Sequence, residues 1–163
     1  MAKHIYYFHL LAGMCMLELG NLASSLAPFN VSAVSVSLNA NAQEAGLVVT
    51  LELFFAAISS LYFGTVAYKG KSLGLFGSLI VIICYYLCSI AENIDQITII
   101  KGFSGVGCGM LIASGHSILA SSYDPNRSYA IFTLFASITA ALLIYISSTC
   151  LLYTSDAADD SLR

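Results

Sequence analysis

The stretch from Ser72 to Ile90, SLGLFGSLIVIICYYLCSI, runs for nineteen residues without a charged side chain. A helix needs roughly 20 apolar residues to cross the hydrocarbon core of a bilayer. Four further apolar segments flank this stretch, at about residues 5–29, 45–67, 97–123 and 129–149. Inside a bilayer each segment must satisfy its own backbone hydrogen bonds, which a helix does. The sequence therefore predicts an all-α fold, a polytopic transmembrane bundle of five helices.

The composition of the whole chain supports the same class. Of its 163 residues, 58% are hydrophobic and 9% are charged, and the mean hydropathy is +0.85. A soluble domain carries about 25% charged residues, so this composition argues against a soluble enzyme. The net charge of −3 argues against a nucleic-acid partner, which would select a basic face. We find no HExxH, GxSxG, P-loop or paired Cys/His spacing, and expect no catalytic residues, metal or cofactor.

The segments between the spans predict the orientation. Pro28 closes the first span, and the Ser- and Asn-rich residues 30–44 are typical of a loop with a helical extension. If the spans alternate, the side that holds the N-terminus is basic and the opposite side holds only acidic residues. Basic residues concentrate on the cytoplasmic side, which predicts an integral protein of the cell (inner) membrane with a cytoplasmic N-terminus. The basic residues are Lys3, Lys69, Lys71 and Arg127, and the acidic ones are Glu44, Glu92 and Asp95.

Residues 150–163, CLLYTSDAADDSLR, change abruptly from apolar to acidic and polar. Most of this segment resembles the translation of a transposon-derived sequencing adapter that is read through in frame. We therefore expect a non-native tail at 150–163, with a genuine acidic tail as the alternative, and exclude it from the fold. Without it, five basic and six acidic side chains remain, a net charge of −1.

Two motifs resemble those of the major facilitator superfamily of transporters. The first is GTVAYKGK at residues 64–71, where the family has a glycine, a small residue, an acid–base pair, another glycine and a basic cluster. Tyr68 stands where the family has an aspartate, which caps a neighbouring helix and helps to lock one conformation. The positions of this sequence that match are Gly64, Ala67, Lys69, Gly70 and Lys71.

The second motif is KGFSGVGCG at residues 101–109, a basic residue followed by glycines at two-residue spacing, with Lys101 in place of the usual arginine. Gly105 and Gly109 also form a GxxxG pair with Gly107 between them, which permits close helix packing in lipid. These glycines either serve helix packing alone or also permit the packed helices to rock or bend. The segments QEAGL at 43–47 and DPNR at 124–127 stand where family members carry similar residues.

The resemblance implies a partial N-terminal bundle over residues 1–149, with five of its six helices. It further implies a secondary active transporter that moves a small solute by alternating access, with protons as a possible coupling ion. The partners would be this solute, the lipid bilayer and the C-terminal half of the same transporter. The alternative is a small membrane-embedded enzyme or a structural membrane subunit without transport activity.

Three charged residues lie within the predicted spans, where each charge costs roughly 3 kcal/mol on insertion scales. At 1.5 Å per residue, Glu18 and Glu52 lie about 10 Å and Lys101 about 6 Å from the same outer face. Their role is structural if they form a buried ion pair, such as Glu18 with Lys101, or if Lys101 extends to the lipid headgroups. Their role is functional if they bind protons or solute, for which Glu18 is the better candidate and Glu52 could be its structural neighbour. His116 lies near the cytoplasmic end of the fourth span, where it either titrates or packs through hydrogen bonds.

The topology can be tested by cysteine-accessibility labelling on a background from which all five cysteines of the chain have been removed. Cysteines that replace Lys69 and Arg127 should react with an impermeant reagent from the cytoplasm, and those that replace Glu92 and Asp95 only from outside. Labelling at position 95 from the cytoplasmic side would overturn the orientation.

Overall fold

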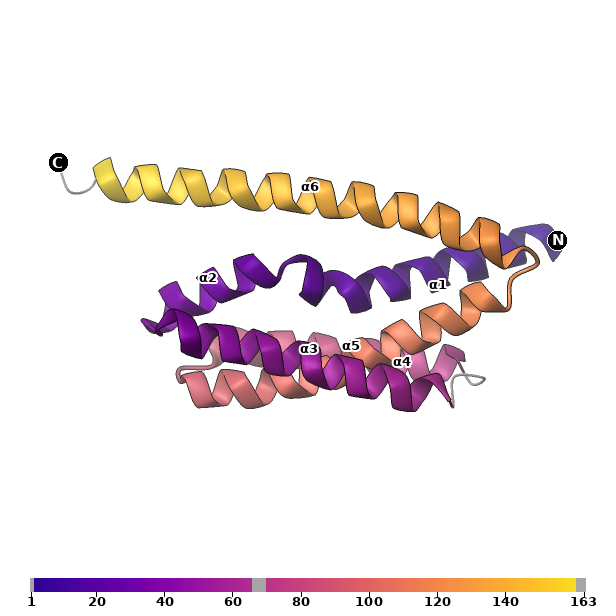
Figure 1. Cartoon of the computed structure of the whole chain (residues 1–163), viewed down its shortest axis with the longest axis horizontal. Helices are drawn as coiled ribbons and strands as arrows, with labels where there is room; N and C mark the ends of the chain where they lie inside the picture. Colours follow the sequence, from indigo (N-terminus) through magenta and orange to yellow (C-terminus); the bar gives the residue numbers. More distant parts are fainter. Residues whose placement is uncertain (1, 66–69, 161–163) are drawn as a thin grey trace.

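The computed structural model describes residues 2–65 and 70–160, with side-chain positions for 7–65 and 72–149. This part of the chain is all-α (Figure 1). Four of its helices are long and apolar enough to cross a membrane, and a bent helix pair gives a fifth candidate span. The helices are α1 (Ala2–Ser25), α2 (Ala27–Leu38), α3 (Ala42–Gly64), α4 (Gly70–Ile90), α5 (Ile94–Ala120) and α6 (Pro125–Asp160).

The first candidate span is broken: α1 and α2 meet at Leu26 with a bend of 55°. Pro28 lies in the first turn of α2, where its missing N–H costs no helical hydrogen bond, so it begins a helix here. Val34 of α2 packs against Ala45 and Val48 of α3, which holds this helix in place. Of the loop with a helical extension predicted over residues 30–44, the helical part is therefore the longer one, and only residues 39–41 separate α2 from α3.

Side-chain caps fix where α3 and α6 begin. The backbone N–H of Glu44 donates to the Asn41 side chain (2.8 Å), and the N–H of Asn41 donates to the Glu44 carboxylate (3.1 Å). Such a capping box satisfies two N–H groups that the helix itself leaves unpaired. The carboxylate of Asp124 accepts a hydrogen bond from the N–H of Arg127 (3.1 Å) in the same way. With these caps the second and fifth spans begin three to four residues earlier than predicted.

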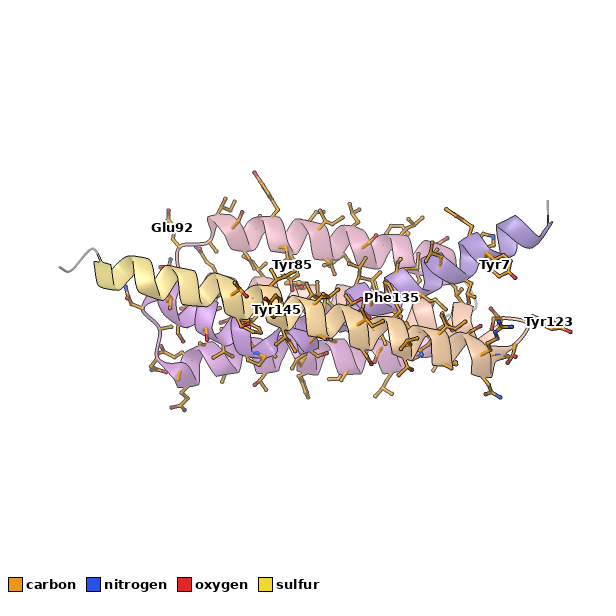
Figure 2. The ribbon with its side chains drawn as sticks, turned by 90° about the horizontal axis from the view of Figure 1, so that it is seen from above. Tyr7, Tyr85, Glu92, Tyr123, Phe135 and Tyr145 are labelled. Carbon is orange, nitrogen blue, oxygen red and sulfur yellow. The ribbon has the colours of Figure 1, made fainter. Side chains whose placement is uncertain are left out.

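Helix α5 is the centre of the bundle, and α1, α3 and α4 all pack on it. It runs parallel to α3 and antiparallel to α1 and α4, as the short turns between successive spans predict. Helix α6 lies alongside the others and approaches them only near its first residues (Figure 1). Figure 2 shows Glu92 at one end of the bundle and Tyr7 and Tyr123 at the other. The α4–α5 turn and the α5–α6 turn therefore lie at opposite ends.

Glycines on different faces of α5 let three neighbouring helices approach closely. A β-carbon on Gly105 would collide with the carbonyl oxygen of Glu52 in α3, and one on Gly109 would lie 2.5 Å from the Ala56 carbonyl oxygen. One on Gly107 would meet the Gly77 carbonyl of α4 at 2.9 Å, and one on Gly115 the Gly13 carbonyl of α1 at 2.9 Å. Van der Waals contact drives helix association in lipid, so these glycines set the packing of the bundle.

We expect Gly105→Ala to destabilise the bundle by about 1–3 kcal/mol, because its methyl group must displace the backbone of α3. Gly46→Ala and Gly64→Ala are matched controls, since a β-carbon at either position meets no atom within 4 Å. Thermal unfolding in detergent, followed by circular dichroism, compares the three variants. An unchanged melting temperature for Gly105→Ala would contradict the close α3–α5 contact.

Candidate functional site

The two charged residues buried deepest in the bundle form an ion pair between α3 and α5. The Nζ atom of Lys101 lies 3.1 Å from Oε2 and 3.4 Å from Oε1 of Glu52, so the ammonium donates to both carboxylate oxygens. The hydroxyl of Ser104 donates to Oε1 at 3.0 Å. Glu52 is 0% and Lys101 5% exposed. The structure thus pairs Lys101 with Glu52, and the alternative that pairs it with Glu18 is wrong.

Helix α4 contributes a third group to this cluster. The Nζ atom of Lys101 lies 4.4 Å from the centre of the Tyr85 ring, a cation–π distance. Tyr85 is labelled in Figure 2, beside α4. The ammonium of Lys101 therefore contacts α3 through a carboxylate and α4 through an aromatic face. We call Glu52, Lys101, Ser104 and Tyr85 the charge cluster.

The local sequence explains how the cluster forms. Lys101 and Ser104 are three residues apart on α5 and share one face. Gly105 brings the backbone of α3 against that face at Glu52, so the carboxylate reaches both donors. Every buried side-chain nitrogen and oxygen in the described part of the chain has a hydrogen-bond partner. The cluster is therefore a satisfied ion pair, in which each charge offsets the cost of burying the other.

Glu18 lies elsewhere. It is half-buried on α1 and makes no hydrogen bond or ion pair with the residues that the structure describes. Its neighbour Leu17 packs on Gly115 of α5, and Met16 packs on Gly74 of α4. Successive helical residues differ by about 100° around the axis. Glu18 therefore lies on the flank of α1 that is turned away from α4.

His116 is exposed at the end of α5 and contacts the start of α6. Its Nδ1 lies 3.2 Å from the hydroxyl of Tyr129, and this hydroxyl also donates to the carbonyl oxygen of His116 at 3.3 Å. The rings lie 5.8 Å apart at 32°. These contacts agree with the hydrogen-bonded packing role rather than with a free imidazole. Both residues line a hollow of about 600 Å³ between α3, α5 and α6, which we call the α3/α5/α6 groove.

The remaining predicted motif residues are dispersed. Gly64 is exposed at the end of α3, Lys69 lies outside the described residues, and Gly70 and Lys71 begin α4. Gly105, Gly107 and Gly109 are buried in helix contacts. Among the described residues, no group of three or more His, Cys, Asp or Glu side chains could hold a metal ion.

Sequence reasoning missed three participants in these sites. Ser104 stands within the KGFSGVGCG motif, three residues after Lys101, and this spacing was a usable signal. Tyr85 lies in the uncharged third span, and its place beside Lys101 depends on how α4 packs on α5. Tyr129 depends likewise on the turn between α5 and α6. The hydrophobic periodicity of a single sequence does not show which residues of different helices contact each other.

Removal of one member of the charge cluster should be costly, because the other charge stays buried. We expect Glu52→Gln and Lys101→Met each to lower the free energy of unfolding by about 3–5 kcal/mol, and the double variant to restore most of it. Glu92→Gln is the matched control, since Glu92 is exposed at a helix end. Thermal unfolding in detergent measures the stability of the two single variants, the double variant and the control. Additive losses in the double variant would show that the two residues do not interact.

Comparison with protein-family models, with curated proteins and with solved structures finds no match to this chain. The structural class of the protein is therefore assigned from its own composition and architecture. It is an all-α protein with four to five helices that could cross a membrane. These spans suggest an integral membrane protein, with the lipid bilayer as its surroundings.

Proposed function

We propose that this chain is part of a secondary active transporter, which moves a small solute across the membrane by alternating access. In this proposal residues 1–149 form five helices of a major facilitator N-terminal bundle, and a C-terminal half completes the carrier. The two motifs, their order along the chain and the sides of their loops support this reading. The chain would carry no catalytic step and no cofactor, and its N-terminus would lie in the cytoplasm.

One observation carries the proposal, namely a carboxylate inside a candidate span, Glu18, that has no partner among the described residues. Glu52 and Lys101 offset each other, so the charge cluster is explained by structure alone. Glu18 lacks such a partner among the described residues. Ionisable residues in spans are expensive and commonly mark the paths of ions and protons. A carboxylate that gains and loses a proton as the carrier changes conformation would couple transport to a proton gradient.

The test is Glu18→Gln in the complete carrier, reconstituted in proteoliposomes. Glutamine keeps the shape and hydrogen bonds of the side chain but cannot change its charge. We expect uptake driven by a proton gradient to fall to background, while exchange of labelled for unlabelled solute continues without a gradient. Normal gradient-driven uptake in this variant would remove the coupling role of Glu18.

Two controls separate coupling from folding. Glu44→Gln removes an exposed carboxylate at the start of α3 and should leave both gradient-driven uptake and exchange unchanged. The double variant of Glu52 and Lys101 removes the other intramembrane charges and should keep coupling. Loss of both uptake and exchange in Glu18→Gln, together with a lower melting temperature, would instead assign Glu18 to packing.

A further inference from the structure

We infer that the α3/α5/α6 groove binds an uncharged, polyhydroxylated solute of the sugar or polyol type. The groove measures about 600 Å³, within the range of small-molecule sites, about 300–1,000 Å³. It lies at the end of the bundle where α5 ends and α6 begins. Its polar lining comes from all three helices and consists of Ser60, Thr65, His116, Ser117 and Tyr129. This inference rests on the proposed transport function and adds the class of solute.

The hydrogen-bonding pattern of the groove favours a ligand that brings donors. The Ser60 hydroxyl donates to the Ala57 carbonyl (2.9 Å), and the Thr65 hydroxyl donates to the Tyr62 carbonyl (2.7 Å). Each hydroxyl has one hydrogen and two lone pairs, so both oxygens remain acceptors. The groove therefore offers oxygen acceptors whose own hydrogens are already committed to the backbone of α3.

The histidine adds a further polar group. Its Nδ1 lies 3.2 Å from the Tyr129 hydroxyl, and this hydroxyl lies 3.3 Å from the carbonyl oxygen of His116. In a neutral imidazole one ring nitrogen donates and the other accepts, so Nε2 accepts when Nδ1 carries the hydrogen and donates when it does not. A solute hydroxyl group suits either form, because it both donates and accepts, while other hydroxyl groups of the solute donate to the oxygens of Ser60 and Thr65.

The uncharged side chains of the described lining residues favour a neutral solute. None of the described residues that line the groove carries a carboxylate, an ammonium or a guanidinium group. The charge cluster is distant, because Lys101 stands fifteen residues before His116 on α5, about 22 Å along the helix. A charged ligand would give up part of its hydration here and find no opposite charge in return.

The experiment measures the binding of four probes of nearly equal size to the full 163-residue chain in lipid nanodiscs. D-glucose and myo-inositol are neutral, gluconate is an anion and glucosamine is a cation. Saturation-transfer NMR titrations detect weak binding and yield dissociation constants. We expect both neutral probes to bind at least about tenfold more tightly than either charged probe. Tighter binding of gluconate or glucosamine, or no binding of either neutral probe, would overturn the inference.

Variants locate the binding. Ser60→Ala and Thr65→Val each remove one acceptor and should weaken glucose binding by about 2- to 10-fold. Thr50→Val is the matched control, because Thr50 is exposed on the same helix and its hydroxyl donates to the Gly46 carbonyl in the same way (2.8 Å). Equal affinity in Ser60→Ala, Thr65→Val and the unaltered chain would show that glucose binds elsewhere.

The outcome is independent of the coupling test. Glucose binding is measured in nanodiscs, where no gradient exists, so it does not report on coupling through Glu18. If Glu18→Gln abolishes gradient-driven transport of some other solute while glucose fails to bind, the transport proposal stands and the polyol inference fails. If glucose binds through Ser60 and Thr65 but no gradient-driven transport occurs in the complete carrier, the transport proposal fails instead.

Discussion

The carbonyl oxygen of Glu52 lies so close to Gly105 that a β-carbon there would collide with it, and much of the bundle depends on this approach. It brings the α3 backbone against the face of α5 that carries Lys101 and Ser104. The side chain of Glu52 can then reach both donors at 3.0–3.4 Å. The close packing of α3 on α5 and the neutralisation of the buried charges therefore depend on each other, because Gly105 permits the close approach that lets Glu52 reach Lys101. A bulkier residue at position 105 would separate the helices and leave two charges buried in an apolar interior.

The same arrangement accounts for the central position of α5. Hydrophobic burial does not distinguish one apolar helix from another in lipid, since the lipid tails are as apolar as leucine. Shape then decides which helices associate. The small residues of α5 lie on faces that are turned toward α3, α4 and α1, so these three helices pack on α5. Helix α6 exposes large apolar side chains along its length, among them the labelled Phe135 and Tyr145 (Figure 2), and it stays apart from the other helices along most of its length.

The spans could be predicted from the sequence because hydrophobic length is a local property. Depth arithmetic likewise placed Glu52 and Lys101 at similar levels, and an ion pair between two intramembrane charges follows from the cost of leaving either alone. The choice of partner did not follow, since Glu18 has a similar depth and only the packing of Gly105 on α3 favours Glu52. The length of helix α2 was underestimated because Ser and Asn argue for a loop, while Val34 is held by contacts with Ala45 and Val48. The roles of Tyr85 and Tyr129 required the arrangement of helices in space.

The described chain separates its polar groups by type along α5. Near the start of this helix, Lys101 is neutralised by Glu52, and the pair offers no free charge to a solute. Near its end, His116 and the hydroxyl groups around it provide hydrogen-bonding groups without a carboxylate, ammonium or guanidinium among the described lining residues, in a groove that is open to a ligand. Glu18, on the flank of α1 away from α4, is the one ionisable side chain among these that lacks a partner in the described residues. A carrier built this way would recognise a neutral solute in the groove and sense the ion gradient at a different residue. Recognition and coupling would then communicate through the backbone contacts of α1 with α5, where Gly13 and Gly115 hold the two helices together.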